Sequence, residues 1–188
     1  MKRVLAAALL ALSAGAVIAD AQTKMFGFMD PMPTARLKML FPKAVVFTPR
    51  DKDPLHFTAY AEDLTRKPDA RPIGFAFWTQ ELMPEELAYH GSIHMLVGMD
   101  THGVLTGVFV DHHTEPYGWF SIEPPEFAAQ FDGKSIRDPF VVGEDIDATS
   151  RATITLRSAA RSIRESSRMI AKAFLSPGEI RNTGASRP

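Results

Sequence analysis

The sequence contains no cysteine among its 188 residues. Without thiols the chain cannot form a disulfide, hold an iron–sulfur cluster through thiolates or use thiol chemistry. Any redox centre in this protein must therefore be a group that it binds.

The sequence also lacks an excess of charge of either sign. Its 21 Lys and Arg residues stand against 22 Asp and Glu residues, and the formal net charge is −1 at pH 7. Nucleic-acid-binding proteins usually have a strongly basic surface, so a formal net charge of −1 argues against nucleic-acid binding. The length and a hydrophobic content of 45% fit one ordinary globular domain.

Long apolar runs are missing beyond the N-terminus. Lys2-Arg3 precedes an apolar run from Val4 to Val17, and Ala19-Asp20-Ala21 has the small-residue pattern of a cleavage site. The run is short for a membrane span, which needs ~20 apolar residues. We predict a signal peptide over residues 1–21, export to the periplasm or another extracytoplasmic compartment, and a mature chain from near Gln22. An uncleaved membrane anchor is the alternative.

The rest of the chain has the pattern of an α+β domain, with a twisted, largely antiparallel sheet packed against a long C-terminal helix and shorter helices. We expect an irregular lead-in over residues 22–33, the domain over residues 34–176 and a disordered tail over residues 177–188. Hydrophobic periodicity and turn residues set the element boundaries. The predicted helices cover residues 34–41, a short segment from Pro124-Pro125 and residues 155–175, and the predicted strands cover residues 44–47, 57–60, 73–79, 93–99, 104–110 and 140–142.

One side of the final predicted helix is cationic. Arg157, Arg161, Arg164, Arg168 and Lys172 recur at spacings of four, three, four and four residues, which places them on one helix face. Two interpretations stay open. The face is either simply solvated, or it is a docking strip for an acidic redox partner or for lipid headgroups.

Three hydroxyl side chains crowd the start of the same helix. Thr149, Ser150 and Thr153 follow shortly after Asp147. Helix N-termini carry unpaired amide N–H groups and a partial positive charge, and they bind phosphate. The same residues are also typical of an ordinary N-cap, so taken alone they leave both interpretations open.

The stretch from Asp147 to Thr155 reads D-A-T-S-R-A-T-I-T, and it resembles the D-x-x-S-G-A-T pattern of FMN-binding domains. This family carries flavin mononucleotide (FMN) through a phosphoester to threonine. The sequence most resembles the periplasmic FMN-binding domain of nitrous oxide and nitrite reductase regulatory proteins, which is related to FMN subunits of the Rnf and sodium-pumping quinone reductase complexes. The resemblance implies covalent FMN on Thr153. It also implies a surrounding cofactor site of Asp147, Thr149, Ser150, Arg151 and Ala152.

One residue of this stretch departs from the family pattern. Arg151 stands where the family usually has glycine. A cation beside a phosphate is chemically reasonable, because ionised donors make strong hydrogen bonds to phosphate oxygens.

Two further segments extend the resemblance. His113, Glu115 and Pro116 match an H-x-E-T-P-G or H-H-E-P element that lies near the flavin in the family, and Lys134 closes a segment similar to F-x-x-Q-F-x-G-K. The resemblance implies a cofactor-pocket loop at His113 to Pro116. Tyr117 and the aromatic residues after it would then stack on the flavin ring or wall it off. A polar strand end and ordinary core packing are the alternatives.

The run of histidines and carboxylates from Asp111 to Glu115 also raises the question of metal binding. Adjacent residues of a strand point to opposite faces, so His112 and His113 would not easily share one ion. We therefore predict no metal ligand here.

Together these features imply an extracytoplasmic flavoprotein that passes electrons between membrane-associated donors and a respiratory or other redox partner. Its maturation would need a flavin transferase. With no cysteine to relay electrons, its donor and acceptor would be separate proteins. A non-enzymatic accessory or sensor protein that regulates a respiratory metalloenzyme is the alternative. No catalytic residue is predicted, because no arrangement of nucleophile, base and orienting group is readable.

Overall fold

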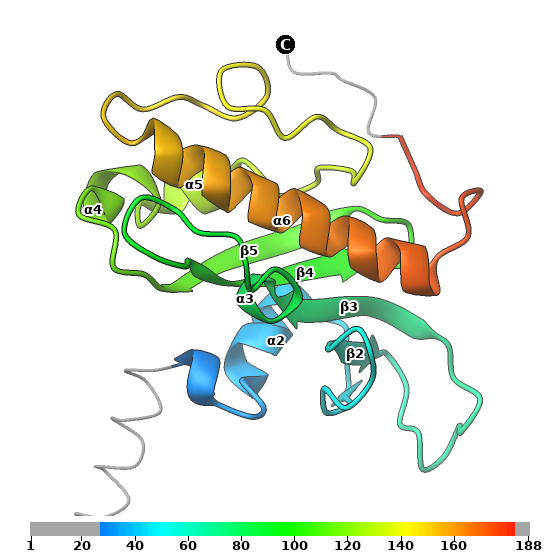
Figure 1. Cartoon of the computed structure of the whole chain (residues 1–188). Coiled ribbons are helices and arrows are strands. Elements are labelled where there is room, and N and C mark those ends of the chain that lie inside the picture. The colour runs from blue at the N-terminus through cyan, green and yellow to red at the C-terminus, as the bar shows by residue number, and fades with distance from the viewer. Residues whose placement is uncertain (1–26, 183–188) are drawn as a thin grey trace, which may run out of the picture.

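The computed structural model describes residues 27–182, in which a five-stranded antiparallel sheet has the order β1-β2-β3-β4-β5. The predicted signal peptide lies outside these residues. Helix α6 covers one face of the sheet and α2 covers the other (Figure 1). The predicted α+β class is confirmed. The elements are η1 (Gly27–Met29), α2 (Thr34–Leu40), β1 (Val46–Phe47), β2 (Phe57–Tyr60), β3 (Pro72–Trp78), α3 (Thr79–Leu82), β4 (His94–Asp100), β5 (Leu105–His112), α4 (Gly118–Ser121), α5 (Pro125–Ala129) and α6 (Thr153–Phe174).

Both faces of the central strands are buried, and β3 shows how the sequence achieves this. Phe75 and Phe77 belong to the core between the sheet and α6, whereas Ala76 and Trp78 belong to the core on the α2 side. Successive strand residues point to opposite faces, so an unbroken apolar run fills two cores at once. Burying each large side chain contributes about 1.5–3 kcal/mol to folding.

Helix α2 packs closely against the sheet because strand glycines leave room for it. A Cβ atom on Gly74 would lie 2.3 Å from Cε1 of Phe41, which directly follows the last residue of α2. Leu37, Leu40 and Phe41 are buried in the core on this side. Glycine at position 74 therefore lets the end of α2 contact the strand closely.

Helix α6 starts two residues earlier and ends one residue earlier than predicted. Six apolar residues were predicted on its buried side. Leu156, Ala159, Ala160, Ile163 and Ile170 are buried against the sheet, whereas Phe174, in the last turn, is 37% exposed. The hydroxyls of two buried serines in the helix turn back to carbonyl oxygens of its own preceding turn, so they carry no unpaired polar group into the core. Within the described residues, no helix has both the length and the hydrophobicity that a membrane span needs.

The strand predicted at residues 140–142 is wrong. The carboxylate of Asp145 accepts hydrogen bonds from the backbone N–H groups of Phe140 and Val141 and from Nζ of Lys134. Burial raises the pKa of Asp145, but these hydrogen bonds outweigh it and leave the pKa below its ordinary value. Phe140 has a φ of 53°, and Val142 makes only an isolated bridge to Ile146. A side chain has taken the donors that a strand would offer to its neighbour.

Two short helices, α3 and α4, lie where the sequence predicted no helix. Thr79 was predicted to close a strand, yet it begins α3, and its hydroxyl donates to the carbonyl of Ile93 and accepts from the N–H of Met95. Helix α4 follows Tyr117 where no helix was predicted. Both lie at the end of the sheet where α6 begins.

The described part of the predicted tail, residues 177–182, lies against the domain. The N–H of Arg181 donates to the carbonyl of His102, and the carbonyl of Arg181 accepts from Oγ of Ser135. These bonds hold the segment at the turn between β4 and β5, at the opposite end from α4.

Candidate functional site

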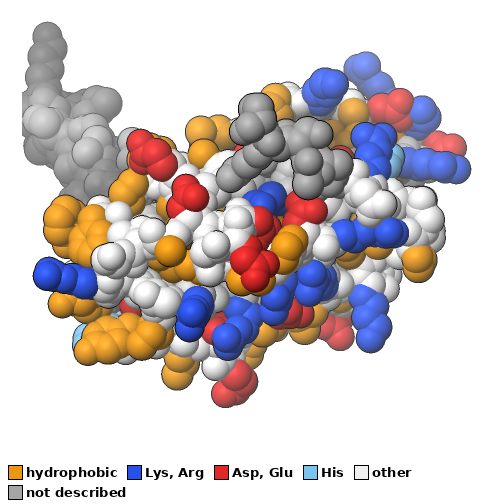
Figure 2. Space-filling view, turned by 90° about the horizontal axis from the view of Figure 1, so that it is seen from above, with side chains coloured by type: hydrophobic (Ala, Val, Ile, Leu, Met, Phe, Trp, Pro, Cys, Tyr) orange, Lys and Arg blue, Asp and Glu red, His pale blue; other side chains and the backbone are white. Residues whose placement is uncertain are grey.

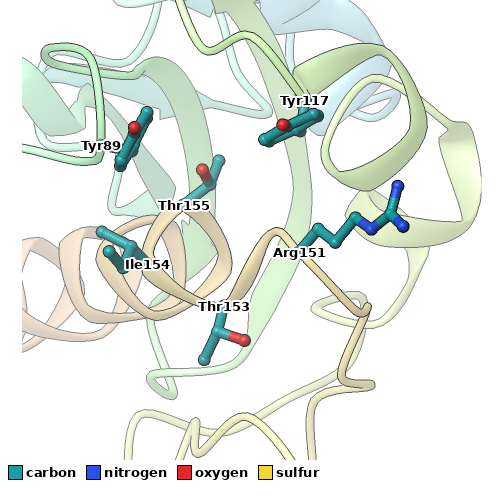
Figure 3. A pocket seen from close by; sticks show the side chains of 6 residues that line it. All are labelled: Tyr89, Tyr117, Arg151, Thr153, Ile154 and Thr155. Atoms are coloured by element: carbon teal, nitrogen blue, oxygen red, sulfur yellow. The ribbon is translucent and has the colours of Figure 1, made fainter.

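A cavity of about 240 Å³ opens at the N-terminus of α6. The first turn of the helix, the turn before it and two loop tyrosines form its walls. Tyr89 and Tyr117 stand on opposite sides of Thr155, and Thr153 and Arg151 lie further along (Figure 3). The lining residues are Tyr89, Tyr117, Arg151, Thr153, Ile154 and Thr155.

No side chain caps the N-terminus of α6. The N-cap residue is Ala152, and none of the preceding hydroxyls accepts a hydrogen bond from the first turn. The interpretation of Thr149, Ser150 and Thr153 as an ordinary N-cap is therefore wrong. The backbone N–H groups of the first turn have no partner within the helix, and together with the helix dipole they favour an anion at this end.

The turn into the helix brings two polar side chains to the cavity. Arg151 has a φ of 70°, the left-handed region that glycine adopts most easily. This explains in physical terms why the matching pattern usually has glycine at this position. Arg151 and Thr153 are both exposed, and the hydroxyl of Thr153 points toward the side of the helix on which Arg151 lies (Figure 3).

Glu115 lies behind the cavity wall and is only 6% exposed. Its Oε2 atom accepts a 2.5 Å hydrogen bond from Oγ1 of Thr155 and a 3.2 Å bond from the N–H of Tyr89, and Oε1 accepts a 2.6 Å bond from the N–H of His90. One carboxylate therefore joins the helix that carries Thr153 to the loop that carries Tyr89. Its role here is to position both walls of the cavity.

His113 lies two residues before Glu115, in the loop that follows β5. Its Nδ1 atom accepts from the N–H of Glu115, so the ring proton belongs on Nε2, which lies 3.1 Å from Oε1 of Glu123. A Cβ atom on Gly118 would lie 2.1 Å from Cε1 of His113, so the ring fits only because residue 118 is glycine. His112 instead contacts the rings of His94 and Phe28. The two adjacent histidines thus have separate surroundings.

The other candidate residues do not line the cavity. Nζ of Lys134 lies 2.8 Å from Oδ2 of Asp145, which holds the lysine in a half-buried ion pair. The N–H of Asp147 donates to Oε1 of Gln130, and Ala152 is buried in the core. The candidate residues that do not line the cavity are Lys134, Asp147, Thr149, Ser150, Ala152, His113, Glu115 and Pro116.

Sequence reasoning missed Tyr89, Ile154 and Thr155 as lining residues. Thr155 belongs to the hydroxyl-rich stretch, so the same pattern could have included it. Tyr89 belongs to no motif, and only the buried bond to Glu115 brings it to the helix.

Tyr89 is 62% exposed and the nearby Trp119 is 68% exposed. Hydrophobic side chains also gather at the end of the molecule where α4 lies (left in Figures 1 and 2). Exposed apolar surface of this kind marks binding sites.

The residues present fit an FMN group. The uncapped helix end and Arg151 suit a phosphate, the exposed hydroxyl of Thr153 can carry an ester, and the two tyrosines can flank a flat ring. The cavity is smaller than the ~300–1,000 Å³ of pockets that enclose a ligand. A flavin here would keep part of its ring in contact with solvent or with a partner.

Comparison with known proteins relates the segment around this cavity to a family. No curated protein matches the chain. The family model of the FMN-binding domain matches residues 88–167, a range that contains every residue lining the cavity. Residues 88–167 therefore match the FMN-binding domain family, and this match supports FMN as the cofactor.

Proposed function

We propose that the protein carries FMN as a phosphoester on Thr153 and transfers electrons between separate partner proteins outside the cytoplasm. The observation that carries this proposal is the exposed Thr153 hydroxyl at the uncapped start of a 22-residue helix, inside the segment that matches the family. Neighbouring N–H groups and the Arg151 guanidinium are available to the phosphate oxygens.

Attachment requires an activated flavin and a separate flavin transferase. Oγ1 of Thr153 would attack the FMN phosphorus of a flavin adenine dinucleotide, so that a new P–O bond forms, the pyrophosphate bond breaks and AMP leaves. The hydroxyl proton would pass to a base on the transferase. Since Thr153 is exposed on the folded domain, the transferase could reach it without unfolding the helix.

When bound, FMN supplies one- and two-electron chemistry, and this chain supplies the binding, orientation and electrostatics. Tyr89 and Tyr117 would flank the ring, and Glu115 would fix the distance between them through Thr155 and the loop backbone. A covalent bond suits a protein exported by its N-terminal segment, which could not regain lost FMN outside the cytoplasm. Electrons would enter and leave through the exposed part of the ring.

The test is the intact mass and visible spectrum of the mature protein, expressed with and without a flavin transferase. The wild-type protein should gain the mass of one FMN and the absorption of a flavin only with the transferase. Thr153→Val should abolish the adduct without unfolding the domain. Thr101→Val makes the same substitution in the turn between β4 and β5 and should load normally.

Two results would count against the proposal. Absence of an adduct on the wild-type protein with an active transferase would limit it to noncovalent FMN. If Thr153→Val lacks flavin and still supports the cellular pathway, the accessory or sensor role becomes the better interpretation.

Export is tested separately. N-terminal sequencing of the protein recovered from the periplasm should begin near Gln22. Recovery from the cytoplasm alone, with Met1 intact, would remove the extracytoplasmic part of the proposal.

A further inference from the structure

A second cavity, of about 250 Å³, lies along α6 beside the segment at residues 140–142. Three arginines of the helix form one wall, and Phe140, Val141 and Val142 form the other. We call this feature the arginine groove, defined by Arg157, Arg161, Arg164 and residues 140–142. The groove exists because Asp145 folds this segment into a turn instead of a strand.

The positive charge of the groove is only partly neutralised. Arg161 is 3.5 Å from Oε2 of Glu86, and Arg164 is 2.8 Å from Oε1 of Glu165. Arg157 is exposed and has no hydrogen bond or ion pair with any residue in the described range 27–182. Figure 2 looks onto this face of the molecule, where Lys and Arg side chains gather beside carboxylates. At least one guanidinium in the groove is therefore free to bind an incoming anion.

The groove runs along the helix in line with the proposed flavin attachment point. Arg157, Arg161 and Arg164 follow Thr153 by four, eight and eleven residues, so all four lie on one face of α6. At a rise of about 1.5 Å per residue, Arg157 lies about 6 Å beyond Thr153 along the helix axis. A molecule that occupied the groove would lie beside the proposed flavin attachment point at Thr153.

We propose that the arginine groove docks an acidic electron-transfer protein and holds it against the flavin; this rests on the proposed function. Arg157 and Arg164 are about 10 Å apart along the axis, which suits several carboxylates on one protein surface better than one small anion. The apolar wall at Val141 and Val142 adds contact area between those charges. Complementary charge of this kind mainly increases the rate of association.

Two other cations of the same face are not part of the docking site. Arg168 donates to the carbonyl oxygens of Ile136 and Asp138, so it fastens α6 to the neighbouring loop. Lys172 is exposed and lies 15 residues beyond Arg157, about 22 Å along the axis. Lys172 is therefore a matched control, because its reversal changes the net charge by the same amount.

The first experiment measures binding without flavin, so it does not depend on the proposed function. A fluorescein-labelled hexaglutamate peptide is titrated against the unflavinylated mature protein by fluorescence anisotropy. Arg157→Glu should raise the Kd about fivefold at low ionic strength, Arg157→Gln should have a smaller effect and Lys172→Glu should have little. Added salt should remove the difference. Equal effects at positions 157 and 172 would overturn the proposal.

The second experiment measures electron exchange in the flavin-loaded protein by stopped flow. After reduction, its oxidation by an acidic blue copper protein should slow about fivefold in Arg157→Glu and hardly change in Lys172→Glu, whereas oxidation by a basic c-type cytochrome should not slow in either variant. Peptide binding without any electron exchange would leave the groove intact and refute the carrier. If vesicles rich in phosphatidylserine bind more tightly than the peptide and lose binding in Arg157→Glu, the groove recognises lipid headgroups and the protein partner is ruled out.

Discussion

Replacing Arg151 by glycine should give a more stable domain than replacing it by alanine, although both changes remove the guanidinium at the candidate site. Arg151 has a φ of 70° in the turn before α6. A residue with a Cβ atom in this left-handed region costs about 1–2 kcal/mol, and glycine avoids that cost. Glycine also loses more backbone entropy on folding, which costs about 0.5–1 kcal/mol. The difference leaves a net gain of about 0.5–1 kcal/mol for Arg151→Gly.

The reference for this gain is Arg151→Ala rather than the wild type. Alanine removes the guanidinium but keeps the Cβ atom, so the comparison of glycine with alanine isolates the backbone. For a domain of this size, 1 kcal/mol corresponds to about 2–4 °C in Tm. Arg151→Gly should therefore melt about 1–4 °C above Arg151→Ala and show a higher midpoint in urea with an unchanged m-value. Phe140, at a φ of 53°, offers no such test, because its ring is buried in the core.

An Arg151→Gly protein that is no more stable than Arg151→Ala would refute this reasoning. The same pair also reports on flavin loading. If only the backbone of the turn presents Thr153 to the transferase, Arg151→Gly should load at least as fast as the wild type. If the guanidinium holds the phosphate, both variants should load more slowly than the wild type.

Three further predictions concern the residues that support the site and the core. Glu115→Gln should destabilise the protein by about 2–3 kcal/mol in urea denaturation, because an amide cannot accept all three hydrogen bonds of the buried carboxylate; a loss under 0.5 kcal/mol would exclude its bridging role. Gly118→Ala should cost about 1–3 kcal/mol through its clash with His113, whereas helix propensity alone favours alanine, so the sign of the change decides. Burial lowers the pKa of His56, so the folded state stays neutral while the unfolded state takes up a proton below about pH 6.5. Stability should therefore fall as the pH drops through 6.5. In His56→Gln the free energy of unfolding should decrease less between pH 7 and pH 5 than in the wild type. Part of the decrease should remain, because burial also lowers the pKa of His94. An unchanged slope would contradict the assignment to His56.

Sequence patterns predicted best those helices and strands whose formation depends on residues close together in the sequence. The hairpin of β4 and β5 surrounds a turn at Asp100 to Gly103, and α6 carries a regular apolar face, so both could be predicted from periodicity and turn residues. The start of α6 was also placed within two residues, which brought Thr153 to a helix N-terminus. Local signals were sufficient for these elements because each residue's surroundings are set within one or two turns.

The failures involve contacts between residues distant in the sequence or competition by a side chain. Residues 140–142 are apolar enough for a strand, but the Asp145 carboxylate takes their N–H groups. Lys134 matched a family segment, and its charge is used by that same carboxylate. Tyr89 became a cavity wall through a bond to Glu115, 26 residues away, which no periodicity encodes. The buried polar contacts around the site were thus the least predictable part of the fold.

The pairing of β3 with β4 shows that the matched segment, residues 88–167, is not a folding unit. Five residue pairs join these strands, from Gly74–Asp100 to Trp78–Leu96. In each pair the β3 residue lies outside the matched segment and the β4 residue lies inside it. A protein cut to residues 88–167 would present β4 as a bare edge, open to pairing with another copy. It would also lose Phe75 and Phe77 from the core beneath α6. Residues 28–87 contribute no wall to the cavity, yet they supply the strand pairing and the core contacts on which the matched segment depends.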